Sequence, residues 1–409
     1  MGKKIKKKRK KKIKEVKMNE IYEKYIKMIK EGLYRKQPIT DAPLVYHLAV
    51  FYTIVGALIG KSRYFVYGNK KIYPNLWTVL VGKTSYYRKS TSIQLGVDVL
   101  RRIDNTILLP SEFSLESLTE ILSEKPEGLF WIDEFSNFFS QFHRSYLAGG
   151  LSLFLQLYES DLTIERHLIK GQFTIENPCV SILSSTTFEG ITSSLKEREL
   201  RTGLLPRFTF FTALKKDFEI EMPDVINYEL KEQVMSKLKE VLPESQASMP
   251  ITQDAIELYS CYTKKTRTSD ANLVGFYSRA NITFIKLFII ETVLRGKDKI
   301  TADIVNDVLN EFSEIIYHSI HDVFYSLTWT PFQEKEKKVS DHLSEALETA
   351  KSTSETWVSR TDLIRATRLS SSELNAVINT MFDKDEIEKK TEKKTDSVKK
   401  VVFYRLKRG

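Results

Sequence analysis

The chain has 409 residues, of which 42% are hydrophobic and 28% are charged, a composition that excludes a disordered or fibrous protein. Its length allows about two to four domains with cores of their own. The net charge of +10 arises in residues 1–17, which hold 11 Lys/Arg and one acid, so the rest of the chain is balanced in charge.

The first part of the chain predicts a disordered tail followed by helices. Residues 1–17 form a lysine run, which is typical of a tail that is attracted to phosphates or that only adds solubility. In residues 18–75 apolar side chains recur at helical spacing, which predicts an N-terminal collar of two or three helices. The most apolar stretch, Leu44 to Gly60, contains His47 and is shorter than the roughly 20 residues of a membrane span, so we expect a buried helix.

Two further features favour a cytoplasmic location without a membrane partner. Cys179 and Cys261 are too few and too far apart for a disulfide framework or a zinc site, which indicates a reducing compartment. The basic start lacks the apolar core of a signal peptide.

Residues 76–225 predict an α/β core. Short continuous apolar runs indicate four strands that are covered on both faces: Trp77–Val81, Gly128–Ile132, Val180–Leu183 and Phe208–Thr212. Three helices are expected between them: Ser90–Ile103, Leu115–Ser123 and Leu151–Tyr158. This alternation is typical of a parallel sheet with crossover connections. A further strand, Tyr64–Tyr67, is expected just before the core.

The remainder predicts two more domains. Residues 226–328 read as an all-helical lid that includes Asn281–Leu294 and Ala302–Ile316. Residues 329–409 predict three helices and two strands, with a charged link between the strands. That order is typical of a winged helix-turn-helix, in which the link is the wing.

The first candidate site residues follow the first strand of the core. The stretch GKTSYYRKST, which begins at Gly82, leads into a helix, the context in which backbone N–H groups and a lysine bind phosphates. Aligned on Lys89 and Ser90, it departs from the strict P-loop because Arg88 replaces the second glycine and Gly82 is displaced by one residue. We predict that Lys89 binds phosphate and that Ser90, or else Thr91, binds magnesium.

Polar residues also end two later strands. The stretch GLFWIDEF delivers Asp133 and Glu134 at the end of an apolar strand. In a P-loop ATPase the first carboxylate holds magnesium through water and the second polarises the attacking water. Ser185 and Thr186 end the next strand and are placed to sense a γ-phosphate, although Ser and Thr are common at strand ends.

Two arginines complete the predicted ATP site. Arg207 precedes the strand Phe208–Thr212, and Arg279 lies near the start of a lid helix. In an oligomeric ATPase, arginines at these places stabilise charge on the γ-phosphate, one from the neighbouring subunit and one from the lid. Surface arginines of this kind are also common without any such role.

Basic residues in two places are candidates for DNA contact. In the stretch Leu162 to Ile175, apolar and polar residues alternate on both sides of Lys170-Gly171, which predicts a β-hairpin. Its basic residues touch DNA phosphates or are merely solvated. The candidate DNA-binding residues are Arg166, His167 and Lys170 in the hairpin and Arg360, Arg368, Lys399 and Lys400 in the C-terminal domain. The predicted recognition helix, Ser371–Thr380, has no Lys or Arg, so that domain binds DNA through these flanking residues or binds protein instead.

These stretches resemble two groups of proteins. YPNLWTVLVGKTSYYRKST, PEGLFWIDEFSNFF, ENPCVSILSSTT and GLLPRF are similar to an uncharacterised primase-associated P-loop ATPase family of phages, plasmids and genomic islands, including its Arg-Lys-Ser phosphate loop. IDEF, the Lys-Gly hairpin, LLPRF and SRANITFIKL also resemble the minichromosome-maintenance replicative helicases, which are hexameric AAA+ rings. The resemblance covers residues 40–320 and implies that Arg207 is an arginine finger, Arg279 a lid arginine and Lys170 a pore lysine. Ser185 or Thr186 stands where those helicases usually have asparagine.

The fold that follows is an AAA+-like P-loop NTPase core with a helical collar, a helical lid and a C-terminal winged helix. The function expected from it is a ring-forming, ATP- and Mg²⁺-dependent DNA helicase or replication-initiation motor of a mobile element in a prokaryotic host. Its partners would be single-stranded or forked DNA, further copies of the chain, and a primase or other replication proteins. Two alternatives stay open: an AAA+ ATPase that loads or remodels a partner on DNA, and a non-hydrolysing DNA-binding regulator, which the Arg88 substitution favours.

Overall fold

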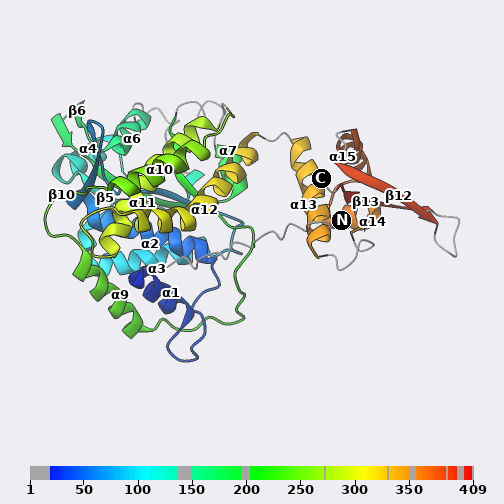
Figure 1. Ribbon diagram of the computed structural model, residues 1–409, viewed down its shortest axis with the longest axis horizontal. Coiled ribbons are helices and arrows are strands. Elements are labelled where there is room, and N and C mark those ends of the chain that lie inside the picture. Colours follow the sequence, from blue (N-terminus) through cyan, green and yellow to red (C-terminus); the bar gives the residue numbers. More distant parts are fainter. Residues whose placement is uncertain are drawn as a thin grey trace, which may run out of the picture. The chain divides into compact units, whose positions relative to one another are not determined.

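The computed structural model divides the chain into two compact units, Met1–Phe324 (unit 1) and Tyr325–Gly409 (unit 2) (Figure 1). The structure describes residues 19–111, 113–136, 138, 150–168, 170–194, 203–270, 273–328, 331–349, 356–383, 386–393 and 400–407. The predicted tail, residues 1–17, lies outside them. Residues 18–75 and 76–225, predicted as separate domains, both belong to unit 1.

A five-stranded parallel sheet forms the centre of unit 1. Its strands, in spatial order, are β4 (Leu108–Leu109), β5 (Glu127–Ile132), β8 (Cys179–Thr186), β3 (Trp77–Val81) and β9 (Thr209–Thr212). The α/β core and its four predicted strands are therefore confirmed. The prediction missed β4, because two residues are too short a run to show any hydrophobic period.

The connections that leave two adjacent strands, β3 and β8, run in opposite directions across the sheet. From β3 the chain passes through α3 (Lys89–Ile103) to β4 at one edge of the sheet, whereas from the adjacent β8 it passes to β9 at the other edge. Ligands of open α/β sheets bind outside the carboxyl ends of the strands at such a switch point. A ligand site is therefore expected at the carboxyl ends of β3 and β8.

The two N-terminal helices are part of the same core. They are α1 (Glu20–Lys30) and α2 (Leu44–Ile59), and α2 packs against α3 and the strands of the sheet. Leu44–Ser62 is apolar and long enough to span a membrane, but 78% of its most apolar window is buried inside the protein. The prediction of a buried core helix is confirmed, and the helix is buried on nearly all sides, against α3 as well as the sheet.

Helices between the strands and after them complete unit 1. Those between strands are α4 (Leu115–Glu124), α6 (Gly150–Glu159) and the unpredicted α7 (Phe188–Ser194). Those after the sheet are α9 (Tyr228–Val241), α10 (Gln253–Lys265), α11 (Val274–Leu294) and α12 (Ala302–Thr328). The last two are longer than predicted, and α12 ends four residues beyond unit 1. The stretch predicted as all-helical also contains β10 (Ala247–Ser248), which pairs with β1 (Arg63–Tyr67) of the hairpin β1–β2 (Lys70–Ile72).

The predicted hairpin is present as the antiparallel pair β6 (Thr163–Leu168) and β7 (Gly171–Glu176). It lies against α4. Gly171 has a φ of +139°, which suits glycine at the turn.

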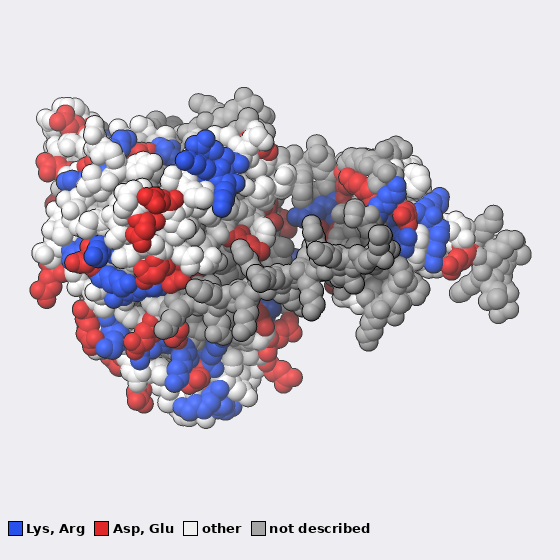
Figure 2. All heavy atoms as spheres, in the orientation of Figure 1, with Lys and Arg blue, Asp and Glu red and all other residues white. Residues whose placement is uncertain are grey.

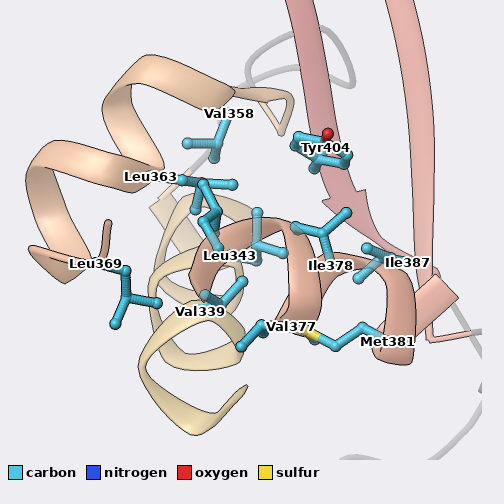
Figure 3. Packing of buried hydrophobic residues seen from close by; sticks show 11 residues of the cluster. Val339, Leu343, Val358, Leu363, Leu369, Val377, Ile378, Met381, Ile387 and Tyr404 are labelled. Carbon is cyan, nitrogen blue, oxygen red and sulfur yellow. The ribbon is translucent and has the colours of Figure 1, made fainter. Parts of the chain in front are cut away.

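Unit 2 packs three helices against a small sheet. The helices are α13 (Pro331–Thr349), α14 (Arg360–Thr367) and α15 (Ser371–Asp383). The strands run in the order β11 (Val358–Ser359), β13 (Lys400–Leu406) and β12 (Ile387–Lys393). Leu343, Leu363 and Val377 are fully buried where the three helices meet (Figure 3). The wing was predicted for the link Glu392–Lys400; its ends belong to β12 and β13, and residues 394–399 lie outside the described residues.

Candidate active site

The loop that follows β3 is shaped by Gly82. A Cβ built on Gly82 would lie 2.3 Å from the hydroxyl of Tyr46, so no larger residue fits unless Tyr46 moves. The Tyr46 hydroxyl donates a hydrogen bond of 2.6 Å to the carbonyl of Val81, and the Gly82 N–H donates to the carbonyl of Thr186 at 3.2 Å. The loop thus starts at the junction of β3 and β8.

Lys89 is the first residue of α3, and its side chain turns back to the loop. Its Nζ donates to the carbonyl of Gly82 at 2.6 Å and to that of Lys83 at 3.2 Å. Burial lowers the pKa of Lys89, and the charges of Glu134 and Glu189 oppose that shift. Both acceptors are neutral carbonyls, so neither hydrogen bond neutralises the positive charge of the ammonium group. Ser90 beside it is exposed at the start of the helix, and Thr91 in the same turn is half-buried.

Arg88, which replaces a glycine of the strict P-loop pattern, forms an unpredicted ion pair. Its backbone has φ 48° and ψ 41°, in the left-handed region. Its Nε lies 2.5 Å from Oδ1 of Asp41, whose Oδ2 accepts a hydrogen bond of 2.5 Å from Lys216. Burial raises the pKa of Asp41, but Lys216 and Arg88 outweigh it, so the pKa lies below its ordinary value. The carboxylate is therefore ionised at neutral pH.

The two predicted carboxylates follow β5. Asp133 is exposed, whereas Glu134 is half-buried. Oε1 of Glu134 accepts hydrogen bonds from Thr186 at 2.7 Å and from Ser136 at 2.8 Å. The hydroxyl of Ser185 donates to the backbone carbonyl of Asp133 at 3.2 Å. The ends of β5 and β8 are thus joined through the residues that the sequence singles out.

The structure brings the predicted nucleotide-binding residues together at the carboxyl ends of the parallel strands. Lys89 follows β3, the carboxylates follow β5, and the Ser/Thr pair ends β8, which lies between those strands. Sequence reasoning missed Asp41, Lys216 and Glu189. Asp41 and Lys216 lie far from the loop in sequence, and only the fold brings them to it. Glu189 is three residues after Thr186, and its place beside a strand end was the only signal.

The two predicted arginines lie together at the opposite, amino ends of the strands. Arg207 precedes β9, and its Nη2 donates to Oε1 of Glu159 at 2.9 Å. Nη2 of Arg279 lies 3.1 Å from the same oxygen. Burial opposes ionisation of Glu159, but the two arginines outweigh it and lower its pKa. Arg279 therefore joins Arg207 at the amino ends of the strands, whereas a lid arginine was expected at the γ-phosphate.

A tyrosine and a buried lysine extend this arginine cluster. The ring of Tyr158 lies 5.5 Å from the guanidinium of Arg207, 5.2 Å from that of Arg279 and 4.1 Å from Nζ of Lys286. Burial is the main cause that lowers the pKa of Lys286 to about 7. Its Nζ donates to the carbonyl of Asn75 at 2.7 Å. Sequence reasoning missed Lys286, which lies two turns after Arg279 on α11.

The hairpin residues predicted to contact DNA differ in exposure. His167 and Lys170 are exposed, and Arg166 is half-buried. Nζ of Lys170 forms an ion pair of 2.9 Å with Glu120 of α4, and this hydrogen bond raises the lysine's pKa. Lys170 is therefore paired with a carboxylate of the same chain.

The basic residues predicted in unit 2 have different surroundings. Nη2 of Arg360 donates to the hydroxyl of Ser371 at 2.6 Å and to Oδ1 of Asn375 at 2.9 Å, so it ties α14 to α15. Arg368 is exposed at the end of α14. Lys399 lies outside the described residues, and Lys400 starts β13.

No protein-family model matches this sequence, and no curated protein matches it. A cation at a helix start, a fixed carboxylate and an exposed carboxylate at a switch point can bind a phosphate chain and activate a water.

Proposed function

We propose that the chain is an ATP-hydrolysing AAA+ motor that acts on DNA, as a helicase or replication-initiation ATPase of a mobile genetic element. In this proposal the sheet of unit 1 is a P-loop NTPase core, α9 to α12 are its lid, and unit 2 is a winged helix. The observation that carries it is the meeting of Lys89, Glu134 and Thr186 at the switch point of a parallel sheet.

The residues at this edge fit ATP with magnesium. Magnesium, when bound, would neutralise charge on the phosphates. Lys89 would bind phosphate oxygens, and Ser90 and Asp133, both exposed, would hold the metal. Both hydrogen bonds of Glu134 described here fall on Oε1, so Oε2 is the oxygen that would orient a water and accept its proton.

The position of the arginines supports hydrolysis between subunits. Strand β3, with five residues, spans about 16 Å. Arg207 and Arg279 lie at the amino edge, and Lys89 at the carboxyl edge, so the arginines of one subunit do not serve its own loop. An arginine that stabilises the transferred phosphoryl group in trans requires a neighbouring copy. This supports a ring of identical subunits, which the resemblance to the replicative helicases makes a hexamer.

The charge distribution favours DNA contacts that are confined to small regions. Lys and Arg are interspersed with Asp and Glu over unit 1 on the face that Figure 2 shows. The hairpin β6–β7, with His167 and Lys170, would contact single-stranded DNA in the ring, and Arg368 of unit 2 would make a further contact. Such contacts add local affinity without a net basic body.

The first test is ATP hydrolysis with and without single-stranded DNA, with the oligomer mass recorded in the same buffer. The variants are Lys89→Ala, Glu134→Gln and the matched control Lys83→Ala, whose exposed side chain belongs to the same loop. We expect DNA to stimulate hydrolysis in the wild type and in the control. We expect both site variants to lose at least about a hundredfold, since each lacks a charge at the reacting group.

The result also separates the alternatives. Equal rates in all four proteins, with DNA binding intact, would overturn the motor and leave a DNA-binding regulator. Hydrolysis without displacement of a strand from a forked substrate would favour an ATPase that loads or remodels a partner on DNA.

A further inference from the structure

Arg88 has the backbone conformation that glycine provides at this place in the strict phosphate-loop pattern. Its φ of 48° and ψ of 41° lie in the left-handed region, where a Cβ crowds the following carbonyl. Glycine adopts this region freely, whereas an arginine there carries a steric cost that favourable contacts can offset. The turn comes directly before Lys89, so its conformation sets the direction of the first residue of α3.

Asp41 supplies a contact that holds the arginine. The carboxylate is 4% exposed and lies 2.5 Å from Nε of Arg88. Its second oxygen accepts from Lys216, whose side chain is 9% exposed. A buried carboxylate is stabilised only by partners of this kind. Without Asp41, the two cations would face each other across its place, and repulsion would drive Arg88 away.

A second contact joins the same loop to the segment after β9. Nζ of Lys216 lies 4.3 Å from the centre of the Tyr86 ring, and the Tyr86 hydroxyl donates to Glu219 at 2.8 Å. Asp41 therefore lies at the centre of a network that joins the region before α2, the phosphate loop and the segment 213–219.

We propose that Asp41 is a positioning residue for phosphate binding: by pairing with Arg88 it holds the left-handed turn that directs Lys89, and so replaces the freedom of the missing glycine. This rests on the proposed ATP-binding function. It also gives the N-terminal region a role in nucleotide affinity, since loss of the Asp41 carboxylate would alter the phosphate loop.

The test is a double-mutant cycle on the full-length protein with Asp41→Asn and Arg88→Gly, read as the dissociation constant of a fluorescent ATP analogue with Mg²⁺. We expect Asp41→Asn to weaken binding about tenfold, within the range of direct ion-pair coupling. In the Arg88→Gly background the same change is expected to cost less than about twofold, because glycine holds the turn unaided.

The matched control is Asp217→Asn. Asp217 is a carboxylate of the same segment, and it accepts from the N–H of Leu44 at 2.7 Å. We expect this control to bind the analogue as the wild type does. An equal loss from Asp41→Asn in both backgrounds would overturn the proposal, because the loss would then arise from Lys216 or from general destabilisation.

A melting experiment without nucleotide distinguishes failure of this proposal from failure of the proposed function. If the wild type binds no ATP, the proposed function fails. The ion pair is then judged by Tm: we expect Asp41→Asn to lower Tm by less in the Arg88→Gly background than in the wild type. Additive Tm changes would show that Asp41 does not hold Arg88.

Discussion

Thr186 donates a hydrogen bond of 2.7 Å to Glu134 across the ends of two neighbouring strands. Thr186 is fully buried, so its hydroxyl has little freedom to turn to water. The bond joins the residue that would activate water to the strand that lies beside the phosphate loop. It therefore fixes the direction of the carboxylate, as the proposed role of a general base would require.

Removal of this bond is expected to affect the rate of hydrolysis more than nucleotide affinity. Thr186→Val keeps the shape and removes the donor, and a hydrogen bond to a charged group contributes about 1.5–3 kcal/mol. We expect kcat to fall by about ten- to a hundredfold with the ATP dissociation constant within twofold. The control is Ser184→Ala on the same strand, whose hydroxyl donates to the carbonyl of Ile132. An equal loss of rate in the control would assign the effect to the strand rather than to Glu134.

Mixed rings test the placement of the arginines. Arg207→Ala and Lys89→Ala are each expected to be inactive alone. Because a site would combine Lys89 of one subunit with Arg207 of the next, about a quarter of the interfaces in an equimolar mixture are intact. We therefore expect the mixture to recover up to about a quarter of wild-type hydrolysis. A mixture as inactive as its parts would contradict hydrolysis in trans.

The hairpin ion pair predicts opposite effects of its two members on DNA binding. Lys170→Ala removes one cation, so we expect weaker binding to single-stranded DNA. The slope of the logarithm of the binding constant against the logarithm of the salt concentration should fall in magnitude by about one. Glu120→Gln removes the carboxylate that Lys170 contacts, so we expect tighter binding. Titrations with labelled oligonucleotide at several salt concentrations measure both. Identical salt slopes in all three proteins would exclude Lys170 from the interface.

The buried Lys286 predicts how stability depends on pH. Burial lowers its pKa from 10.5 to about 7, so between these values the unfolded chain holds a proton that the folded chain does not. The free energy of unfolding therefore rises with pH in this window, by at most about 1.4 kcal/mol per pH unit. We expect Lys286→Met to show a smaller rise between pH 7.5 and 9 in urea unfolding. The same slope in both proteins would contradict a neutral Lys286.

The parts of the fold that repeat a pattern were predictable from the sequence. Apolar runs such as Trp77–Val81 are long enough to show that they are covered on both faces, and the helices between them show the period of 3.6 residues. β4 and β10 have two residues each and show no period. Such short strands exist because a neighbouring strand is already in place, which is a property of the fold.

Some residues of the candidate site were likewise predictable from the sequence, and others were not. Lys89, Asp133 and Glu134 were predictable because each follows a recognisable strand or starts a helix. Asp41 was not, because its role depends on an ion pair with a residue 47 positions away. The position of Arg279 beside Arg207 also depends on how α11 packs, which spacing along the chain does not encode.

The two cysteines of unit 1 differ sharply in reactivity. Both are free thiols; Cys179 is buried in β8, and Cys261 is exposed on α10. Burial raises the pKa of the Cys179 thiol to about 12, so it forms almost no thiolate, the reactive species, at neutral pH. A maleimide dye therefore attaches to α10 alone while the fold is intact. The second thiol becomes reactive only when β8 leaves the sheet, so the rate of double labelling measures the opening of the core.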